Sequence, residues 1–152
     1  HSVGQRLLEL PAGLLDIHAE DELDCAKREL QEEAGLAAEE WGVLVDLVTS
    51  PGFAEEAVRV FIARGLREVD RPEAEDEEAD MRLSWVGIDD AAGKALAGEI
   101  TNSIAVSGIL AAAHLLASGA SPRSVDEPFR FRPASLANRR SAQGIVPDMK
   151  RI

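Results

Sequence analysis

Three glutamates, Glu29, Glu32 and Glu33, lie close together in a segment, 22–34, that has helical spacing and good helix formers. At 3.6 residues per turn, Glu29 and Glu33 lie one turn apart on one stripe, with Glu32 beside them. Like charges at this spacing destabilise an isolated helix by about 0.2–0.5 kcal/mol per pair. Because Mg²⁺ prefers carboxylate oxygens, the cluster predicts a divalent metal site. A bare Glu-x-x-Glu-Glu string also fits a solvated acidic helix face.

The residues around these glutamates form a longer pattern. It consists of Gly13, six residues, Glu20, seven residues, and then Arg-Glu-Leu-Gln-Glu-Glu-Ala-Gly-Leu over 28–36. This pattern resembles the Nudix box, in which five residues separate the glycine from the first glutamate. Every position from Glu20 onward fits without a gap. The extra residue falls in the loop before the helix, where insertions are tolerated, so the register of the carboxylates is unchanged.

The resemblance implies a loop–helix–loop that holds a divalent metal ion. Glu29 and Glu33 would bind the metal directly, and Glu32 would bind it directly or support its ligands. Glu33 would therefore serve catalysis as well, and the backbone carbonyl of Ala12 would complete one site. Arg28 would orient the carboxylates by a salt bridge. The residues implied to support the site are Gly13, Glu20 and Arg28.

Three further stretches resemble the ADP-ribose pyrophosphatase branch of the family, and its actinobacterial members in particular. They are Leu-Pro-Ala-Gly at 10–13, a proline fifteen residues beyond Leu36, and Asn-Ser-Ile-Ala at 102–105. The turn around that proline resembles the branch's substrate loop, although a Ser-Pro-Gly turn by itself fits an ordinary hairpin. The substrate-binding residues implied are Ser50, Pro51, Gly52 and Phe53.

An acidic run over 73–80 lies where this branch carries a catalytic glutamate on a loop. Glu78 is the best positional match and Glu77 the second, and either would manage the attacking water. The same run also fits a solvated, exposed loop.

The function implied is hydrolysis of ADP-ribose to AMP and ribose 5-phosphate, with Mg²⁺ as cofactor and Mn²⁺ as a possible substitute. Another nucleoside diphosphate derivative, such as GDP-mannose or NADH, is the nearest alternative substrate. A catalytically silent ADP-ribose sensor and a simple acidic scaffold are more distant alternatives. Branch members are usually homodimers with additional upstream strands, which this chain, starting at His1, is expected to lack.

These residues must be positioned by an α/β fold, expected to be a mixed β-sheet sandwiched between helices. The hydrophobic patterns predict strands at 7–10, 41–48, 57–63 and 83–88. They predict helices at 22–34, 89–97 and 102–118, the second capped by Asp89 or Asp90.

Composition limits the partners of the chain. Its 152 residues suit one domain, and its net charge is −12. Residues 1–118, the expected Nudix domain, hold nine Lys and Arg against twenty-five Asp and Glu, whereas 119–152 hold seven against three. The acidic body argues against nucleic acid and anionic membranes as partners. The single cysteine, Cys25, is compatible with a cytoplasmic location, and 119–152 is expected to be an extended or partly disordered tail.

Overall fold

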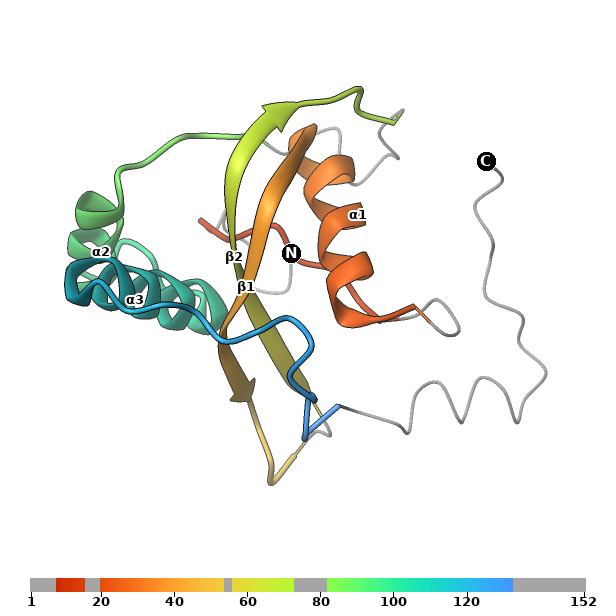
Figure 1. The fold of residues 1–152 in the computed structure, drawn as a ribbon. Coiled ribbons are helices and arrows are strands. Elements are labelled where there is room, and N and C mark those ends of the chain that lie inside the picture. Colours follow the sequence, from red (N-terminus) through yellow and green to blue (C-terminus); the bar gives the residue numbers. More distant parts are fainter. Residues whose placement is uncertain (1–7, 16–19, 54–55, 73–81, 133–152) are drawn as a thin grey trace.

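The computed structural model describes residues 8–15, 20–53, 56–72 and 82–132. Its elements, in chain order, are α1 (Glu22–Ala34), β1 (Leu36–Val48), β2 (Ala57–Glu68), α2 (Ile88–Leu96) and α3 (Ser103–Ser118). Figure 1 shows α1 on one side of the β1–β2 sheet and α2 with α3 on the other. The predicted α/β class, with helices on both faces of the sheet, is therefore confirmed. None of the helices among these residues is both long and apolar enough to span a membrane.

Helix α1 begins and ends where its sequence predicts. The side chain of Asp21 caps the N-terminus by accepting a hydrogen bond from the backbone N–H of Asp24 at 2.8 Å. Gly35 ends the helix in the left-handed conformation, with φ 64°, which glycine adopts without a Cβ penalty. These local signals fix the register of the carboxylates along the helix.

The sheet is an antiparallel hairpin that runs further than the sequence indicated. Its register pairs Leu36 with Glu68 at one end and Val48 with Ala57 at the other, with an irregularity between Val43 and Val45. Among the described residues the sheet has these two strands alone, so the parallel pairing expected of a mixed sheet is not found there. Val43 is fully buried in the middle of the sheet.

The core behind the sheet lies between α2 and α3. Gly108 of α3 comes so close to the sheet that an added Cβ would lie 3.0 Å from Leu10 and 3.2 Å from Val60. This close approach joins the helix pair, the sheet and the segment before the Nudix-like box. The buried cluster there consists of Ala91, Ile100, Ala105 and Ile109.

Two predicted strands are wrong, and so is one predicted cap. Residues 8–10 of the first strand, with residue 7 outside the described range, and residues 82–87 have no regular secondary structure. A strand is stabilised by pairing with a neighbour, and none of the described strands pairs with either segment. Trp85, which lies in the second of these segments, is 71% exposed. Helix α2 starts after Gly87 with no side-chain cap, rather than at Asp89 or Asp90.

Residues 119–132 of the expected tail lie along the sheet (Figure 1). Arg123 exchanges both backbone hydrogen bonds with Val43, at 2.9 and 3.0 Å. Gly42 leaves room for this approach, because an added Cβ would come within 2.6 Å of two carbons of Pro122. The remainder of the expected tail, 133–152, lies outside the described residues.

A charged network fastens this C-terminal segment to the sheet. Asp46 accepts two hydrogen bonds from Arg59, at 2.8 and 3.0 Å, and two from Arg123, at 3.2 Å. The bonds from Arg59, followed by those from Arg123, lower the pKa of the Asp46 carboxyl against the opposing effect of its burial. Arg59 also donates to the backbone carbonyl of Glu127 at 2.7 Å, so the segment and both strands share one ionic centre.

Candidate active site

Arg28 is the centre of the Nudix-like box. Its guanidinium makes a two-pronged contact with Glu20, at 2.9 and 3.1 Å, across the loop that precedes α1. The same side chain donates to Glu29 at 2.6 Å and to Glu32 at 3.1 Å. Arg28 therefore makes the salt bridges that the Nudix resemblance implies. Three acidic positions of the box, separated by up to twelve residues in sequence, meet on one cation.

The electrostatics of this centre keep Arg28 charged. The hydrogen bonds that Arg28 donates to Glu20, with the attraction of Glu29, hold the pKa of Arg28 well above its ordinary value, although partial burial opposes them. The side chain of Glu20 is 10% exposed and that of Arg28 is 26% exposed, so solvent screens the contact weakly. A cation fixed in this way offsets the repulsion among the box carboxylates.

Glu29 and Glu33 face the backbone before the helix. The backbone N–H of Ala12 donates to the carboxylate of Glu33 at 3.1 Å, across twenty-one residues. At Gly13, an added Cβ would overlap the carboxylate end of Glu29. The thiol of Cys25, which is buried, is 3.6 Å from the carbonyl of Leu14 and adds a further tie. The 12–14 backbone is thus packed directly against the carboxylate stripe of α1.

The loop after β2 contacts the C-terminal end of α1. Arg71 donates to the backbone carbonyl of Glu32 at 2.6 Å, and Gln31 donates to the carbonyl of Asp70 at 3.0 Å. The backbone N–H of Val69 donates to the carbonyl of Gly35 at 3.0 Å. Both ends of α1 are therefore fixed by neighbouring loops, which is what a set of metal-binding side chains requires.

The donor chemistry fits a hard divalent cation. Glu29 and Glu33 supply carboxylate oxygens beside the backbone of Ala12, and Mg²⁺ takes one or two carboxylates while it keeps several waters. Within the described ranges, no group of three His, Cys, Asp or Glu side chains is arranged so that it could hold a metal ion without further ligands. By the Nudix resemblance, Glu29, Glu33 and the Ala12 carbonyl would hold such an ion, and Glu32 would bind it directly or support its ligands.

A substitution at Gly13 would test whether Glu29 helps to hold the cation, because the backbone at Gly13 leaves room for the Glu29 carboxylate. Changing Gly13 to Ala is expected to displace the Glu29 carboxylate and to weaken Mn²⁺ binding about tenfold. The free energy of unfolding should fall by less than about 1 kcal/mol, since the displaced group is the end of a flexible side chain. Calorimetric Mn²⁺ titration and urea unfolding would measure the two effects. Gly52→Ala is the matched control, because nothing lies within 4 Å of a Cβ there.

The expected substrate loop forms a tight turn between the two strands. The backbone N–H of Phe53 donates to the carbonyl of Ser50 at 2.9 Å, and Thr49 contacts Glu56 through both its backbone and its hydroxyl. A hollow of about 560 Å³ opens beside this turn. Its lining residues are Val48, Pro51, Gly52, Phe53, Glu56, Ala57, Arg130, Phe131 and Arg132.

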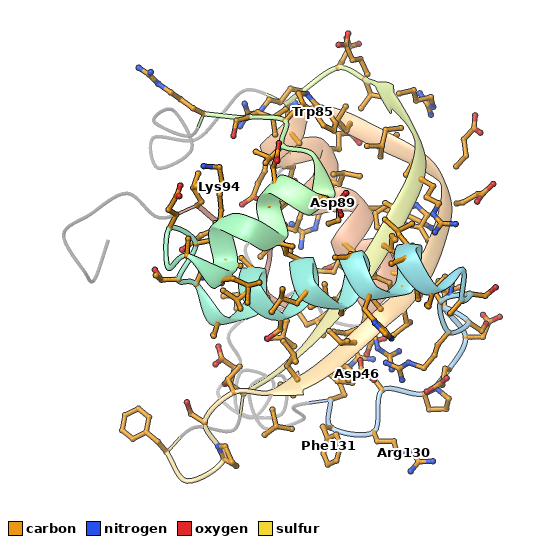
Figure 2. The ribbon with its side chains drawn as sticks, turned by 90° about the vertical axis from the view of Figure 1, so that its left-hand side faces the viewer. Asp46, Trp85, Asp89, Lys94, Arg130 and Phe131 are labelled. Carbon is orange, nitrogen blue, oxygen red and sulfur yellow. The ribbon has the colours of Figure 1, made fainter. Side chains whose placement is uncertain are left out.

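The C-terminal segment also connects this hollow to the box. Arg132, which lines the hollow, donates to the backbone carbonyl of Glu20 at 2.8 Å and lies 3.2 Å from the carboxylate of Glu22. Since Glu20 is also held by Arg28, a short chain of contacts runs from the hollow to the carboxylate cluster. Figure 2 shows Arg130 and Phe131, the two residues that directly precede Arg132, projecting near one end of the sheet.

The two candidates for managing the water, Glu77 and Glu78, lie outside the described residues, so their assignment stays a prediction. The arrangement that is described can orient carboxylates and bind cations. It can also present aromatic and cationic side chains to a ligand in the hollow.

Sequence reasoning missed residues 130–132, because it assigned everything after Gly119 to a tail. A signal was present: Arg-Phe-Arg places an aromatic ring between two cations, a combination that suits a phosphorylated aromatic ligand.

Comparisons with known proteins agree with the box pattern. The profile of the NUDIX domain matches residues 1–104. An ADP-ribose pyrophosphatase of Mycobacterium tuberculosis is 53% identical over 141 residues, which cover 93% of this chain and 68% of that protein. Two further relatives match over 85 residues, or 56% of this chain and 45% of their own lengths. They are a methanol dehydrogenase activator of Bacillus methanolicus, 36% identical, and an ADP-ribose pyrophosphatase of Bacillus subtilis, 38% identical.

Proposed function

Because this chain belongs to the Nudix family and is a Nudix hydrolase, we propose that it hydrolyses the pyrophosphate bond of ADP-ribose. The products would be AMP and ribose 5-phosphate. The cofactor would be Mg²⁺, with Mn²⁺ as a substitute. The observation that carries this proposal is the gathering of Glu20, Glu29 and Glu32 on Arg28, with Glu33 against the Ala12 backbone. The names of two relatives support the choice of ADP-ribose.

The residues would divide the work as follows. Glu29, Glu33 and the Ala12 carbonyl would hold the cation, and Glu32 would bind it directly or support its ligands. Arg28 would keep the carboxylates oriented. When bound, a divalent cation neutralises diphosphate charge and lowers the pKa of a coordinated water. Glu78, or Glu77 beside it, would accept a proton from the attacking water through a carboxylate oxygen. The turn at 50–53 would contact the substrate.

GDP-mannose and NADH remain the alternative substrates. The alternative function is that of a catalytically silent ADP-ribose sensor. A silent domain can lose its metal-binding carboxylates without consequence, whereas this box has all of its acidic positions filled.

We also propose a cytoplasmic homodimer. The exposed apolar side chains of Leu66, Leu83 and Trp85 are consistent with a partner surface.

A substrate panel tests the proposal. The protein is incubated with ADP-ribose, GDP-mannose or NADH, with Mg²⁺ or with EDTA, and the products are separated by ion-exchange chromatography. We expect ADP-ribose to give the highest kcat/KM, with AMP and ribose 5-phosphate in equal amounts and no turnover in EDTA. A higher kcat/KM for another substrate would contradict the substrate assignment. Tight ADP-ribose binding without turnover would favour the sensor instead.

A further inference from the structure

Arg132 brings the C-terminal segment into contact with the start of the box. Its guanidinium donates to the backbone carbonyl of Glu20 at 2.8 Å and lies 3.2 Å from the carboxylate of Glu22. These two partners flank Asp21, which is the N-cap of α1. One side chain from the far end of the chain therefore holds the backbone on both sides of the point at which the helix begins.

The stability of α1 does not account for a cation at this position. The N-terminus of a helix carries partial positive charge, which attracts the acidic side chain of Glu22 but repels a guanidinium. The side chain of Arg132 is also 44% exposed, and an ion pair open to solvent in this way adds little to stability. The place of Arg132 is thus set by the two acceptors that it holds.

The carbonyl of Glu20 takes its hydrogen bond from outside the helix. The backbone N–H of Asp24, four residues later, donates to the side chain of Asp21 instead. The first backbone hydrogen bond of the helix runs from Cys25 to the carbonyl of Asp21, at 3.1 Å. Arg132 supplies the donor to Glu20, so it helps to set the orientation of the peptide that precedes the cap.

The side chain of the same glutamate holds Arg28. Glu20 accepts two hydrogen bonds from Arg28, at 2.9 and 3.1 Å, and Arg28 in turn donates to Glu29 and Glu32. Because Glu20 is held at both its carbonyl and its carboxylate, a shift of its peptide would move the guanidinium that contacts the cluster. Groups that orient metal-binding side chains without touching the ion typically contribute about 10–100-fold to metal affinity or activity.

The segment that carries Arg132 is itself fixed to the sheet. This segment, blue in Figure 1, exchanges both backbone hydrogen bonds of Arg123 with Val43 of β1. Closer to its end, the guanidinium of Arg59 in β2 lies over the ring of Phe129 at 4.8 Å. The carbonyl of Phe129 accepts a hydrogen bond from the backbone N–H of Arg132 at 3.1 Å. Arg132 is therefore presented to the box from a base that both strands hold in place.

We propose that Arg132 is a positioning residue for the metal-binding carboxylates. By holding the carbonyl of Glu20 and the carboxylate of Glu22, it fixes the pair of Glu20 with Arg28. Through that pair it fixes the orientation of Glu29, and it touches neither the ion nor the substrate. This inference rests on the proposed metal-dependent hydrolysis. It adds to the site a residue beyond position 104, where the matched NUDIX profile ends.

Mn²⁺ binding without substrate tests the positioning role. In a titration of the full chain followed by electron paramagnetic resonance, Arg132→Ala should raise the Kd for Mn²⁺ about three- to tenfold. Arg132→Lys keeps a charged donor that can reach one acceptor at a time, so it should raise the Kd less than Arg132→Ala does. Arg64→Ala, which removes an exposed arginine of β2, is the matched control for charge and should leave the Kd within about twofold.

A double-mutant cycle shows whether Arg132 acts through Glu20. Glu20→Gln leaves the backbone carbonyl in place but removes the charge that holds Arg28, and it should weaken Mn²⁺ binding by itself. In that background, Arg132→Ala should raise the Kd by less than about a further twofold, because the pair that it positions is already broken. If the two effects multiplied in full, Arg132 would act by another route and the proposal would be overturned.

Kinetics separate positioning from contact with the substrate. Arg132→Ala should raise the Mg²⁺ concentration that gives half-maximal hydrolysis of ADP-ribose by the same three- to tenfold. The KM for ADP-ribose at saturating Mg²⁺ should change by less than about twofold. Because the contact is partly exposed, the Tm in EDTA should fall by less than about 4 °C. A raised KM with unchanged Mn²⁺ affinity would show that Arg132 contacts the substrate, and the positioning role would be wrong.

The outcome is separable from that of the proposed function. If the unaltered protein hydrolyses ADP-ribose and Arg132→Ala binds Mn²⁺ with the same Kd, the positioning role fails and the function stands. If Mn²⁺ affinity depends on Arg132 through Glu20 but ADP-ribose is not hydrolysed, the positioning role stands and the function fails.

Discussion

Replacing Glu33 by Gln is expected to lower kcat for Mg²⁺-dependent hydrolysis of ADP-ribose by about 100-fold or more. Glutamine has the size of glutamate and keeps one oxygen that can accept the 3.1 Å hydrogen bond from the Ala12 backbone. It removes the negative charge that would hold the cation. Loss of an outer supporting partner typically costs about 10–100-fold in metal affinity or activity, so a direct ligand should cost at least that much.

Two measurements show whether the metal is the cause. Mn²⁺ titration followed by electron paramagnetic resonance, without substrate, should give weaker binding by Glu33→Gln. Thermal unfolding in EDTA should be unchanged, because the contact with Ala12 is preserved. Glu40→Gln is the matched control, since Glu40 is an exposed glutamate on β1. Turnover by Glu33→Gln close to that of the unaltered protein would show that Glu33 does not hold the metal.

Local signals made the helix of the box predictable. Asp21 caps its start and Gly35 ends it, and both act through atoms within a few residues of their own positions. The periodicity of 22–34 then fixes which glutamates share a stripe. Asn102 caps the start of α3, and the apolar residues that follow define the helix in the same way. Where the determining contacts are local, the sequence was sufficient.

Non-local contacts decided the features that were missed. The stretch 83–88 has the composition of a strand, but strand formation requires a partner, and none of the described strands provides one. Residues 119–132 are polar and basic, which suggested a tail. They lie on the sheet because Gly42 leaves space for Pro122 and because Asp46, some eighty residues earlier, supplies a counter-charge. Neither relationship is visible in a local window of sequence.

In the candidate site, too, some contacts could be predicted from the local sequence pattern and others depend on distant segments. The Nudix resemblance implied that Arg28 orients the carboxylates by a salt bridge and that Glu20 supports the site. In the structure Arg28 contacts Glu20, Glu29 and Glu32. The resemblance could not indicate that Arg132 ties the C-terminal segment to the box loop. That tie forms only after the chain has crossed the sheet, so it depends on the whole fold.

Removing Arg28 is expected to have the largest effect on stability. Arg28→Ala would leave Glu20, Glu29 and Glu32 close together, with side chains that are 10%, 14% and 19% exposed and without their common cation. Leaving partly buried charges uncompensated should lower the free energy of unfolding in EDTA by about 2–4 kcal/mol. Urea unfolding followed by circular dichroism would measure the loss.

The conservative variant and a neighbouring lysine separate charge from geometry. Arg28→Lys retains the charge but cannot make the two-pronged contact with Glu20, so we expect about half of the destabilisation seen with Ala. Lys27→Ala removes an adjacent, half-exposed cation that lies 3.6 Å from Asp24, and it should change stability by less than about 0.5 kcal/mol. If Arg28→Ala were no more destabilising than Lys27→Ala, the carboxylates would not depend on Arg28 for their arrangement. The helix itself, with its caps and neighbouring loops, would then be sufficient to hold them.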